Sequence, residues 1–124
     1  MVLSLCDGIA GARRGLELIE ISAALYASSE IDKAAIRATS TAYPDTIHLG
    51  NLEEISEQNI RDLKVRCPRA TVGLVSSGFA CIDLTRLKAG RQGLEGRNSK
   101  LFWGLLRFIS ALTSRWWPEL RWEL

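Results

Sequence analysis

The sequence predicts an α/β fold in which parallel strands alternate with helices. Short apolar runs are bounded by turn residues, and the segments between these runs carry apolar residues at helical spacing. Strands and helices that alternate in this way form right-handed βαβ units and a parallel sheet. At 124 residues, with 47% hydrophobic and 24% charged residues, the chain is one domain with enough apolar material for a core.

The first three elements are expected in the first 27 residues. Val2–Leu5 is a short apolar run of the kind that a buried parallel strand contains. A helix over residues 12–20 follows, with Leu16 and Ile19 on one face. The next apolar run predicts a second strand at about residues 24–27.

A second helix and a third strand follow. Asp32 is a good N-cap, because its carboxylate can accept hydrogen bonds from the free N–H groups of a helix start. The helix continues to Tyr43, and Pro44 stops it. Residues 46–49 then read as a short strand.

The middle of the chain predicts one more helix, one more strand and a long irregular segment. The helix opens at Ser56 and ends near Pro68, and residues 72–75 form the fourth strand. Residues 78–97 follow no regular pattern. A loop of this length in a compact domain is usually functional or disordered.

The last helix begins at Asn98 or Ser99, either of which can cap it. We interpret it as a core helix, because its apolar residues recur at helical spacing: Leu101, Phe102, Leu105, Leu106, Ile109 and Leu112. Pro118 ends it, and a fifth strand starts within residues 120–124.

Composition excludes several classes of protein. The net charge of +2 does not by itself identify a nucleic-acid binder, and no apolar run reaches the length of a membrane span. The N-terminal residues lack the basic region of a signal peptide. The three cysteines, Cys6, Cys67 and Cys81, and the single His48 have no disulfide or zinc spacing. We therefore expect an intracellular, reduced protein without a metal site.

The turn after the first strand predicts a nucleoside-binding site. Asp7, Gly8 and Gly11 lie at a strand-to-helix turn, where glycine lets the backbone approach a ligand. Glu30 follows the second strand, where a carboxylate can accept hydrogen bonds from ribose hydroxyls. The phosphate-binding glycine pattern is absent, which favours an adenosyl ligand without phosphates. An ordinary turn and a solvated carboxylate remain the alternative.

Cys81 is the candidate nucleophile. It lies just beyond the fourth strand, where α/β enzymes place their chemistry, and it precedes a basic, glycine-rich stretch. A buried structural thiol is the alternative, and it would be the commoner one for a cysteine taken alone.

Four segments together resemble the cytosine-5 DNA methyltransferases, and most of all the de novo type. They are VLSLCDGIAG at residues 2–11, SGFACIDLT at 77–85, RQGLEG at 91–96 and LFW at 101–103. The resemblance implies a Rossmann-like fold with helices on both faces of the parallel sheet. It also implies S-adenosylmethionine as methyl donor and DNA as substrate.

The resemblance assigns the cofactor site residue by residue. Asp7, Gly8 and Ile9, with Gly11, would line the methionine end of the cofactor. Glu30 would hold the ribose, and Ile31 would lie against the adenine. Asn51 stands where the family usually has aspartate near the adenine amino group, and Gly78 completes the predicted set.

The same resemblance assigns the chemistry. The Cys81 thiolate would attack C6 of a cytosine flipped out of the duplex. The basic residues around it would contact DNA phosphates: Arg86, Lys88, Arg91, Arg97 and Lys100.

Two departures from the family pattern qualify the expected activity. Ala80 replaces the proline that normally precedes the nucleophile, so that the approach to Cys81 is less restrained. The chain also stops within the fifth strand, before the family's Glu-Asn-Val segment, and Glu123 does not match that glutamate. Residues 1–124 therefore look like the N-terminal part of a catalytic domain, truncated after about five strands and weak or inactive alone. The exposed edge would leave Trp116, Trp117 and Trp122 partly exposed.

Three other functions stay open. The chain could be a catalytically dead module that supports a completing or full-length methyltransferase, a transfer-RNA cytosine-5 methyltransferase fragment, or an unrelated nucleoside-binding domain. The expected location is the nucleus in a eukaryote, or the cytoplasm and nucleoid in a prokaryote.

Overall fold

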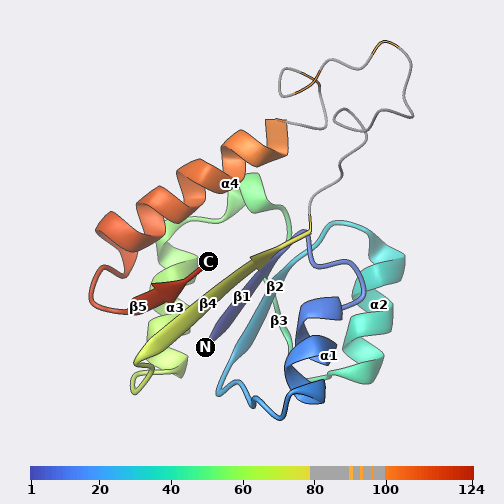
Figure 1. Ribbon diagram of the computed structural model, residues 1–124, viewed down its shortest axis with the longest axis horizontal. Coiled ribbons are helices and arrows are strands. Elements are labelled where there is room, and N and C mark those ends of the chain that lie inside the picture. Colours follow the sequence, from blue (N-terminus) through green and yellow to red (C-terminus); the bar gives the residue numbers. More distant parts are fainter. Residues whose placement is uncertain (79–89, 91–92, 94–95, 97–99) are drawn as a thin grey trace.

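A five-stranded sheet with the strand order β3-β2-β1-β4-β5 forms the middle layer of the protein (Figure 1). The computed structural model describes residues 1–78, 90, 93, 96 and 100–124. All four strand pairs are parallel, which confirms the predicted fold class. The strands are β1 (Val2–Leu5), β2 (Tyr26–Ser29), β3 (Ile47–His48), β4 (Val72–Ser77) and β5 (Arg121–Glu123).

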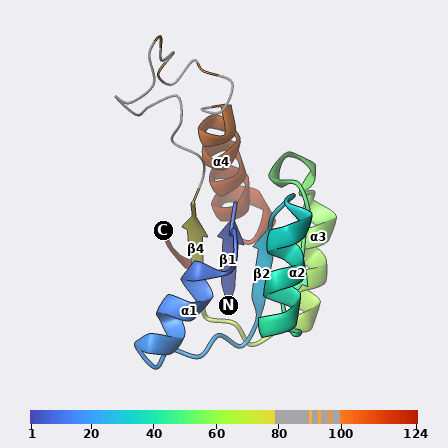
Figure 2. The same ribbon diagram turned by 90° about the vertical axis from the view of Figure 1, so that its right-hand side faces the viewer.

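Helices cover both faces of the sheet. Helices α1 and α2 lie on one side, and α3 and α4 lie on the other (Figures 1 and 2). Their bounds are α1 (Gly11–Leu18), α2 (Lys33–Ala42), α3 (Glu57–Arg66) and α4 (Lys100–Ala111), with a short 3-10 helix η1 (Leu52–Glu54) and a π-helical turn η3 (Leu112–Trp116). Among the described residues no helix has the length and apolar character needed to cross a membrane.

Two predicted helix starts are confirmed by their caps. The Asp32 carboxylate accepts a hydrogen bond from the Ala34 N–H at 3.0 Å. Ser56 and Asn59 form a reciprocal capping box at the start of α3. These side chains satisfy N–H groups that the first helical turn leaves free.

The hydrophobic core lies on the α3–α4 side of the sheet. Leu3 of β1 is in register with Ala27 of β2 and Val75 of β4, so these three side chains share that face. They pack with a buried cluster from the covering helices and loops: Leu52, Ile60, Leu63, Leu105, Phe108, Leu112 and Trp117. On the opposite face, Ser4 of β1 is in register with Ser28 of β2, and both are buried. The face below α1 and α2 is therefore much more polar.

The predicted second strand was placed too early. It spans Tyr26–Ser29 rather than residues 24–27, because Ser28 and Ser29 are buried in the sheet although serine is not a typical strand residue. The Ser29 hydroxyl donates a hydrogen bond to the Gly50 carbonyl at 2.8 Å. Strand β4 likewise extends to Ser77, which pairs with Leu5.

Three burial predictions were wrong. Helix α1 ends at Leu18 and buries none of its residues, and Ile19 is 64% exposed. Leu106 of α4 is 43% exposed, because only part of that helix faces the core. Trp117 is only 4% exposed, since its ring packs within the core and against Trp122 at 6.1 Å between centroids. Trp116 and Trp122 are partly buried, as predicted.

Strand β5 packs closely over a glycine of β4. A Cβ atom added to Gly73 would lie 2.4 Å from two carbons of the Trp122 ring and 2.9 Å from a Leu120 methyl group. The Lys64 ammonium of α3 also contacts the Glu119 carboxylate at 2.5 Å, just before β5. The close approach of β5 therefore depends on the absence of a side chain at Gly73.

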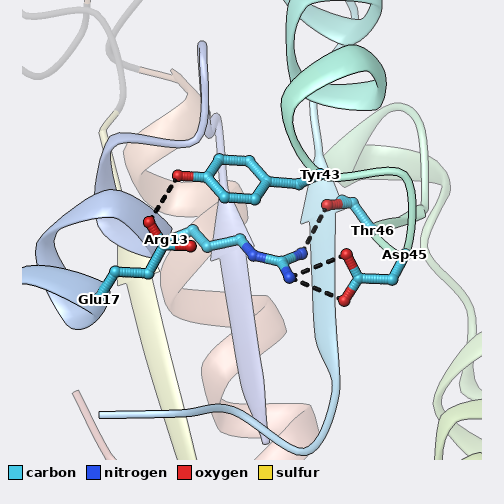
Figure 3. Close-up of polar contacts among 5 residues, drawn as sticks. All are labelled: Arg13, Glu17, Tyr43, Asp45 and Thr46. Atoms are coloured by element: carbon cyan, nitrogen blue, oxygen red, sulfur yellow. Dashed lines mark hydrogen bonds and ion pairs between the residues drawn. The ribbon is translucent and has the colours of Figure 1, made fainter. Parts of the chain in front are cut away.

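Arg13 links α1 to the loop between α2 and β3 (Figure 3). Its guanidinium donates hydrogen bonds to both Asp45 carboxylate oxygens, at 2.7 and 2.9 Å, and to the Thr46 hydroxyl at 3.0 Å. It also lies 4.4 Å from the centre of the Tyr43 ring, and the Tyr43 hydroxyl donates to Glu17 of α1. These contacts attach a helix that has no buried residue of its own.

The pH dependence of stability tests this link. The hydrogen bond from Arg13 lowers the pKa of Asp45 below its ordinary value, so the folded state binds a proton less readily than the unfolded state. The stabilisation is present above the unfolded pKa of about 3.9 and is lost as the pH falls below it. We expect the Asp45→Asn variant to be less stable than the wild-type protein at pH 7, with the difference closing towards pH 3. Urea unfolding midpoints between pH 7 and 3 measure this, and a difference that does not change with pH would contradict it.

Candidate functional site

A cavity of about 320 Å³ lies at the carboxyl ends of the central strands. Strand β1 lies between β2 and β4 in the sheet. The connection after β1 leads to β2 on one side of it, and the connection after β3 leads to β4 on its other side. In parallel sheets a crevice forms at the carboxyl ends of the strands where the strand order reverses in this way. The cavity is lined by Cys6, Gly8, Ser29, Glu30, Ile31, Asn51, Leu52, Gly78 and Leu101. A larger hollow of about 760 Å³ follows the outer face of α4, but its described lining has no carboxylate and no glycine turn.

The turn between β1 and α1 brings backbone to the cavity. Cys6, Gly8 and Ala10 all have left-handed φ values, of 54°, 59° and 65°. Gly8 tolerates this conformation without steric cost, and nothing lies within 4 Å of the position of a Cβ atom there. Gly78 borders the same turn, with its N–H donating to the Leu5 carbonyl at 3.1 Å.

Glu30 fixes this turn to the end of β2. One carboxylate oxygen, Oε2, accepts a hydrogen bond from the Gly8 N–H at 2.8 Å. The other, Oε1, accepts from the Ile31 and Asp32 N–H groups at 2.8 and 2.9 Å. A carboxylate oxygen can accept about two hydrogen bonds, so Oε2 retains capacity for a ligand hydroxyl.

The other cavity walls are mostly apolar. Ile31 is 72% exposed although it is a large hydrophobic residue, and Leu52 and Leu101 contribute further apolar surface. Asn51 also lines the cavity, but its Oδ1 caps η1 by accepting from the Glu53 N–H at 3.1 Å. Apolar walls with a few directed polar groups are typical of small-molecule sites.

Cys6 lines the cavity but is a poor candidate for a nucleophile. Burial raises the pKa of its thiol, and the nearby Glu30 carboxylate raises it further. The thiol therefore stays protonated at neutral pH, and the thiol form is not the attacking form. Cys6 is partly buried and also packs against the core.

Asp7 does not line the cavity. Its Oδ1 accepts hydrogen bonds from the Ser4 hydroxyl at 2.5 Å and from the Tyr26 hydroxyl at 2.9 Å. Its Oδ2 is buried and has no hydrogen-bond partner among the described residues. The carboxylate thus faces the polar side of the sheet, below α1, rather than the cavity.

The structure brings together five of the eight predicted cofactor residues, namely Gly8, Glu30, Ile31, Asn51 and Gly78. Ile9 and Gly11, like Asp7, are outside the cavity lining, and both are exposed. The lining also contains Ser29, Leu52 and Leu101, which the sequence did not predict. Ser29 could have been found from its place directly before Glu30.

Most of the predicted catalytic and DNA-binding residues lie outside the described residues, namely Cys81, Arg86, Lys88, Arg91 and Arg97. Lys100 is described, and it is exposed at the first residue of α4. Within the described part of the chain, no group of three or more His, Cys, Asp or Glu side chains could hold a metal ion.

The family model for C-5 cytosine-specific DNA methylases matches residues 1–116. A search of curated protein sequences finds no match to the chain.

Proposed function

Because the chain belongs to the C-5 cytosine-specific DNA methylase family, we propose that it transfers a methyl group from S-adenosylmethionine to C5 of a cytosine in DNA, with Cys81 as the nucleophile. The observation that supports this proposal best is the cavity at the carboxyl edge of the sheet. It joins the Gly8 backbone, the Glu30 carboxylate and the apolar Ile31 in one lining.

These residues fit an adenosyl cofactor. The cavity volume of about 320 Å³ is within the range of small-molecule sites. Glu30 Oε2 can accept a hydrogen bond from a ribose hydroxyl, and Ile31 and Leu101 offer apolar surface to a purine ring. Bound S-adenosylmethionine would supply the methyl group that the cytosine takes up.

Cys81 would supply the covalent chemistry. Its thiolate forms a bond to C6 of the cytosine ring, which makes C5 nucleophilic. Loss of the C5 proton and departure of the Cys81 thiolate then restore the ring. Cys81 is the third residue after Gly78 of the cavity lining, and three residues of chain span at most about 11 Å.

DNA would be held by positive charge near the nucleophile. Five basic residues follow Cys81 in the sequence, namely Arg86, Lys88, Arg91, Arg97 and Lys100. Asp83 and Glu95 are the acidic residues between Cys81 and Lys100. Such side chains contact phosphates without reading the base sequence. The cytosine must leave the duplex, because C6 is not accessible to a thiolate within stacked bases.

A methyl-transfer assay tests the proposed function directly. The chain is incubated with S-adenosylmethionine carrying a radiolabelled methyl group and with duplex DNA, transfer RNA, or duplex DNA in which every cytosine already carries a C5 methyl group. We expect a low level of label, and only in the unmodified DNA, because Ala80 leaves the approach to Cys81 less restrained. Label in the transfer RNA alone would show that transfer RNA, and not DNA, is the substrate. The absence of label from every nucleic acid would favour a catalytically dead module.

Glu30 is the side chain on which cofactor affinity should depend most. We expect Glu30→Gln to raise the Kd for S-adenosylhomocysteine by about 10- to 100-fold, because a hydrogen bond to a charged group is replaced by a neutral one. Isothermal titration calorimetry measures this change. Asp32→Asn is the matched control, since it removes a charge two residues away and still leaves an N-cap acceptor. Equal affinities for the two variants would exclude Glu30 as the ribose ligand.

A further inference from the structure

We propose that Tyr26 is a positioning residue for the cofactor turn, the segment from Cys6 to Ala10. In this proposal the Tyr26 hydroxyl holds the Asp7 carboxylate, and Asp7 in turn fixes the backbone that presents Gly8 to the cavity. The inference rests on the proposed function, because it explains how the chain shapes its cofactor site from outside the cavity.

The hydrogen bonds connect Tyr26 to the cavity in two steps. The Tyr26 hydroxyl donates to Asp7 Oδ1 at 2.9 Å from the start of β2, and the Ser4 hydroxyl donates to the same oxygen from β1. The next residue, Gly8, donates its N–H to Glu30 Oε2 at 2.8 Å, and Glu30 lines the cavity. The Gly8 N–H belongs to the peptide unit that follows Asp7, so a carboxylate that anchors Asp7 also restrains the direction of this N–H.

The cofactor turn requires such restraint. Cys6 and Ala10 are not glycines, yet both have left-handed φ values, of 54° and 65°. Side chains disfavour this conformation, and it persists only where the surrounding contacts determine it. On the cavity side Glu30 supplies one such contact, and on the polar side of the sheet Tyr26 and Ser4 supply two more.

Tyr26 is itself held in place. The Arg13 guanidinium lies 5.3 Å from the centre of the Tyr26 ring, and the same guanidinium binds Asp45 and Thr46 (Figure 3). Burial raises the pKa of the Tyr26 hydroxyl, and the hydrogen bond to Asp7 raises it further. The hydroxyl therefore stays protonated and remains a donor to Asp7 at every pH where the protein would work.

Tyr26→Phe isolates the hydroxyl, because phenylalanine keeps the buried ring and its contact with Arg13. We expect the Kd for S-adenosylhomocysteine to rise about two- to tenfold, as one lost hydrogen bond predicts. We also expect faster hydrogen exchange at the Gly8 amide under native conditions, while amides of β1 exchange as in the wild-type protein.

Tyr43→Phe is the matched control. Tyr43 also lies against Arg13, at 4.4 Å, but its hydroxyl donates to Glu17 of α1 and does not reach the cofactor turn. This variant should leave both the Kd and the Gly8 amide exchange unchanged.

The outcomes separate this inference from the proposed function. If the wild-type chain binds S-adenosylhomocysteine and both phenylalanine variants bind it equally well, the positioning role of Tyr26 is wrong. If the wild-type chain binds none, the proposed function fails, and Gly8 exchange still decides the positioning role. If the Gly8 amide exchanges as slowly in Tyr26→Phe as in the wild-type protein, the positioning role is overturned. If this amide exchanges faster in Tyr26→Phe but not in Tyr43→Phe, the positioning role is supported.

Discussion

Gly73→Ala is expected to destabilise the domain by about 3 kcal/mol, at the upper end of the usual cost of overpacking. The added Cβ would meet the Trp122 ring at 2.4 Å and Leu120 at 2.9 Å, distances that no relaxed structure retains. The indole cannot simply rotate away, because its N–H donates to the Trp117 carbonyl at 3.1 Å. Strand β5 must therefore shift away from β4 and lose part of its packing. Urea unfolding followed by tryptophan fluorescence and circular dichroism measures the loss.

Two further variants identify the cause. Gly104→Ala places the same methyl group in α4, where nothing lies within 4 Å of the added atom, so it should stabilise the protein slightly. In the Gly73→Ala/Trp122→Ala variant the collision with the Trp122 ring is absent and only the Leu120 contact remains, so the combined loss should be smaller than the sum of the single losses. A Gly73→Ala variant within 1 kcal/mol of the wild-type protein would show that β5 does not pack on β4 as described.

Replacing Cys81 by serine is expected to abolish covalent capture of a 5-fluorocytosine oligonucleotide. Fluorine at C5 cannot leave as a proton does, so under the proposed function the bond between Sγ and C6 would persist after methyl transfer in the wild-type chain. A serine hydroxyl is not ionised at neutral pH and lacks the nucleophilicity of a thiolate. The measured quantity is the amount of protein–oligonucleotide complex that survives denaturing electrophoresis. This complex should form only when S-adenosylmethionine is present.

Cys67→Ala is the control for the capture experiment. Cys67 is buried in the core, away from the cavity lining, and its removal should leave the captured complex in place. Cys6 is not expected to replace Cys81, because burial and the Glu30 charge keep its thiol protonated. Capture that persists in Cys81→Ser would assign the nucleophile to another residue.

The sequence predicted best the elements whose limits depend on local chemistry. Val2–Leu5 is a strand as expected, and the helices after Asp32 and Ser56 begin where these side chains cap them. Strand β2 was misplaced because Ser28 and Ser29 become acceptable in a sheet only through tertiary contacts. The bond from Ser29 to the Gly50 carbonyl is one such contact, and no local pattern reveals it.

The candidate site also contains some residues whose positions could be predicted from the sequence and others whose positions could not. The positions of Gly8 and Glu30 could be predicted, because Glu30 directly follows β2, Gly8 is the third residue after β1, and parallel strands end at one edge. The direction of the Asp7 side chain could not, because it depends on Tyr26, which lies 19 residues away. Leu52 and Leu101 reach the cavity from η1 and α4, and their place there follows from packing between distant segments.

The central place of β1 also affects how the chain folds as the ribosome makes it. Strand β1 pairs with β2, about 24 residues later, and with β4, about 70 residues later. At roughly 5 to 20 residues per second, β4 is synthesised about 4 to 14 s after β1. During that interval one edge of β1 has no partner, and Leu3 is not covered by β4 or α4. The sheet therefore cannot assemble strand by strand in chain order, and most of the domain must be synthesised before its core can close.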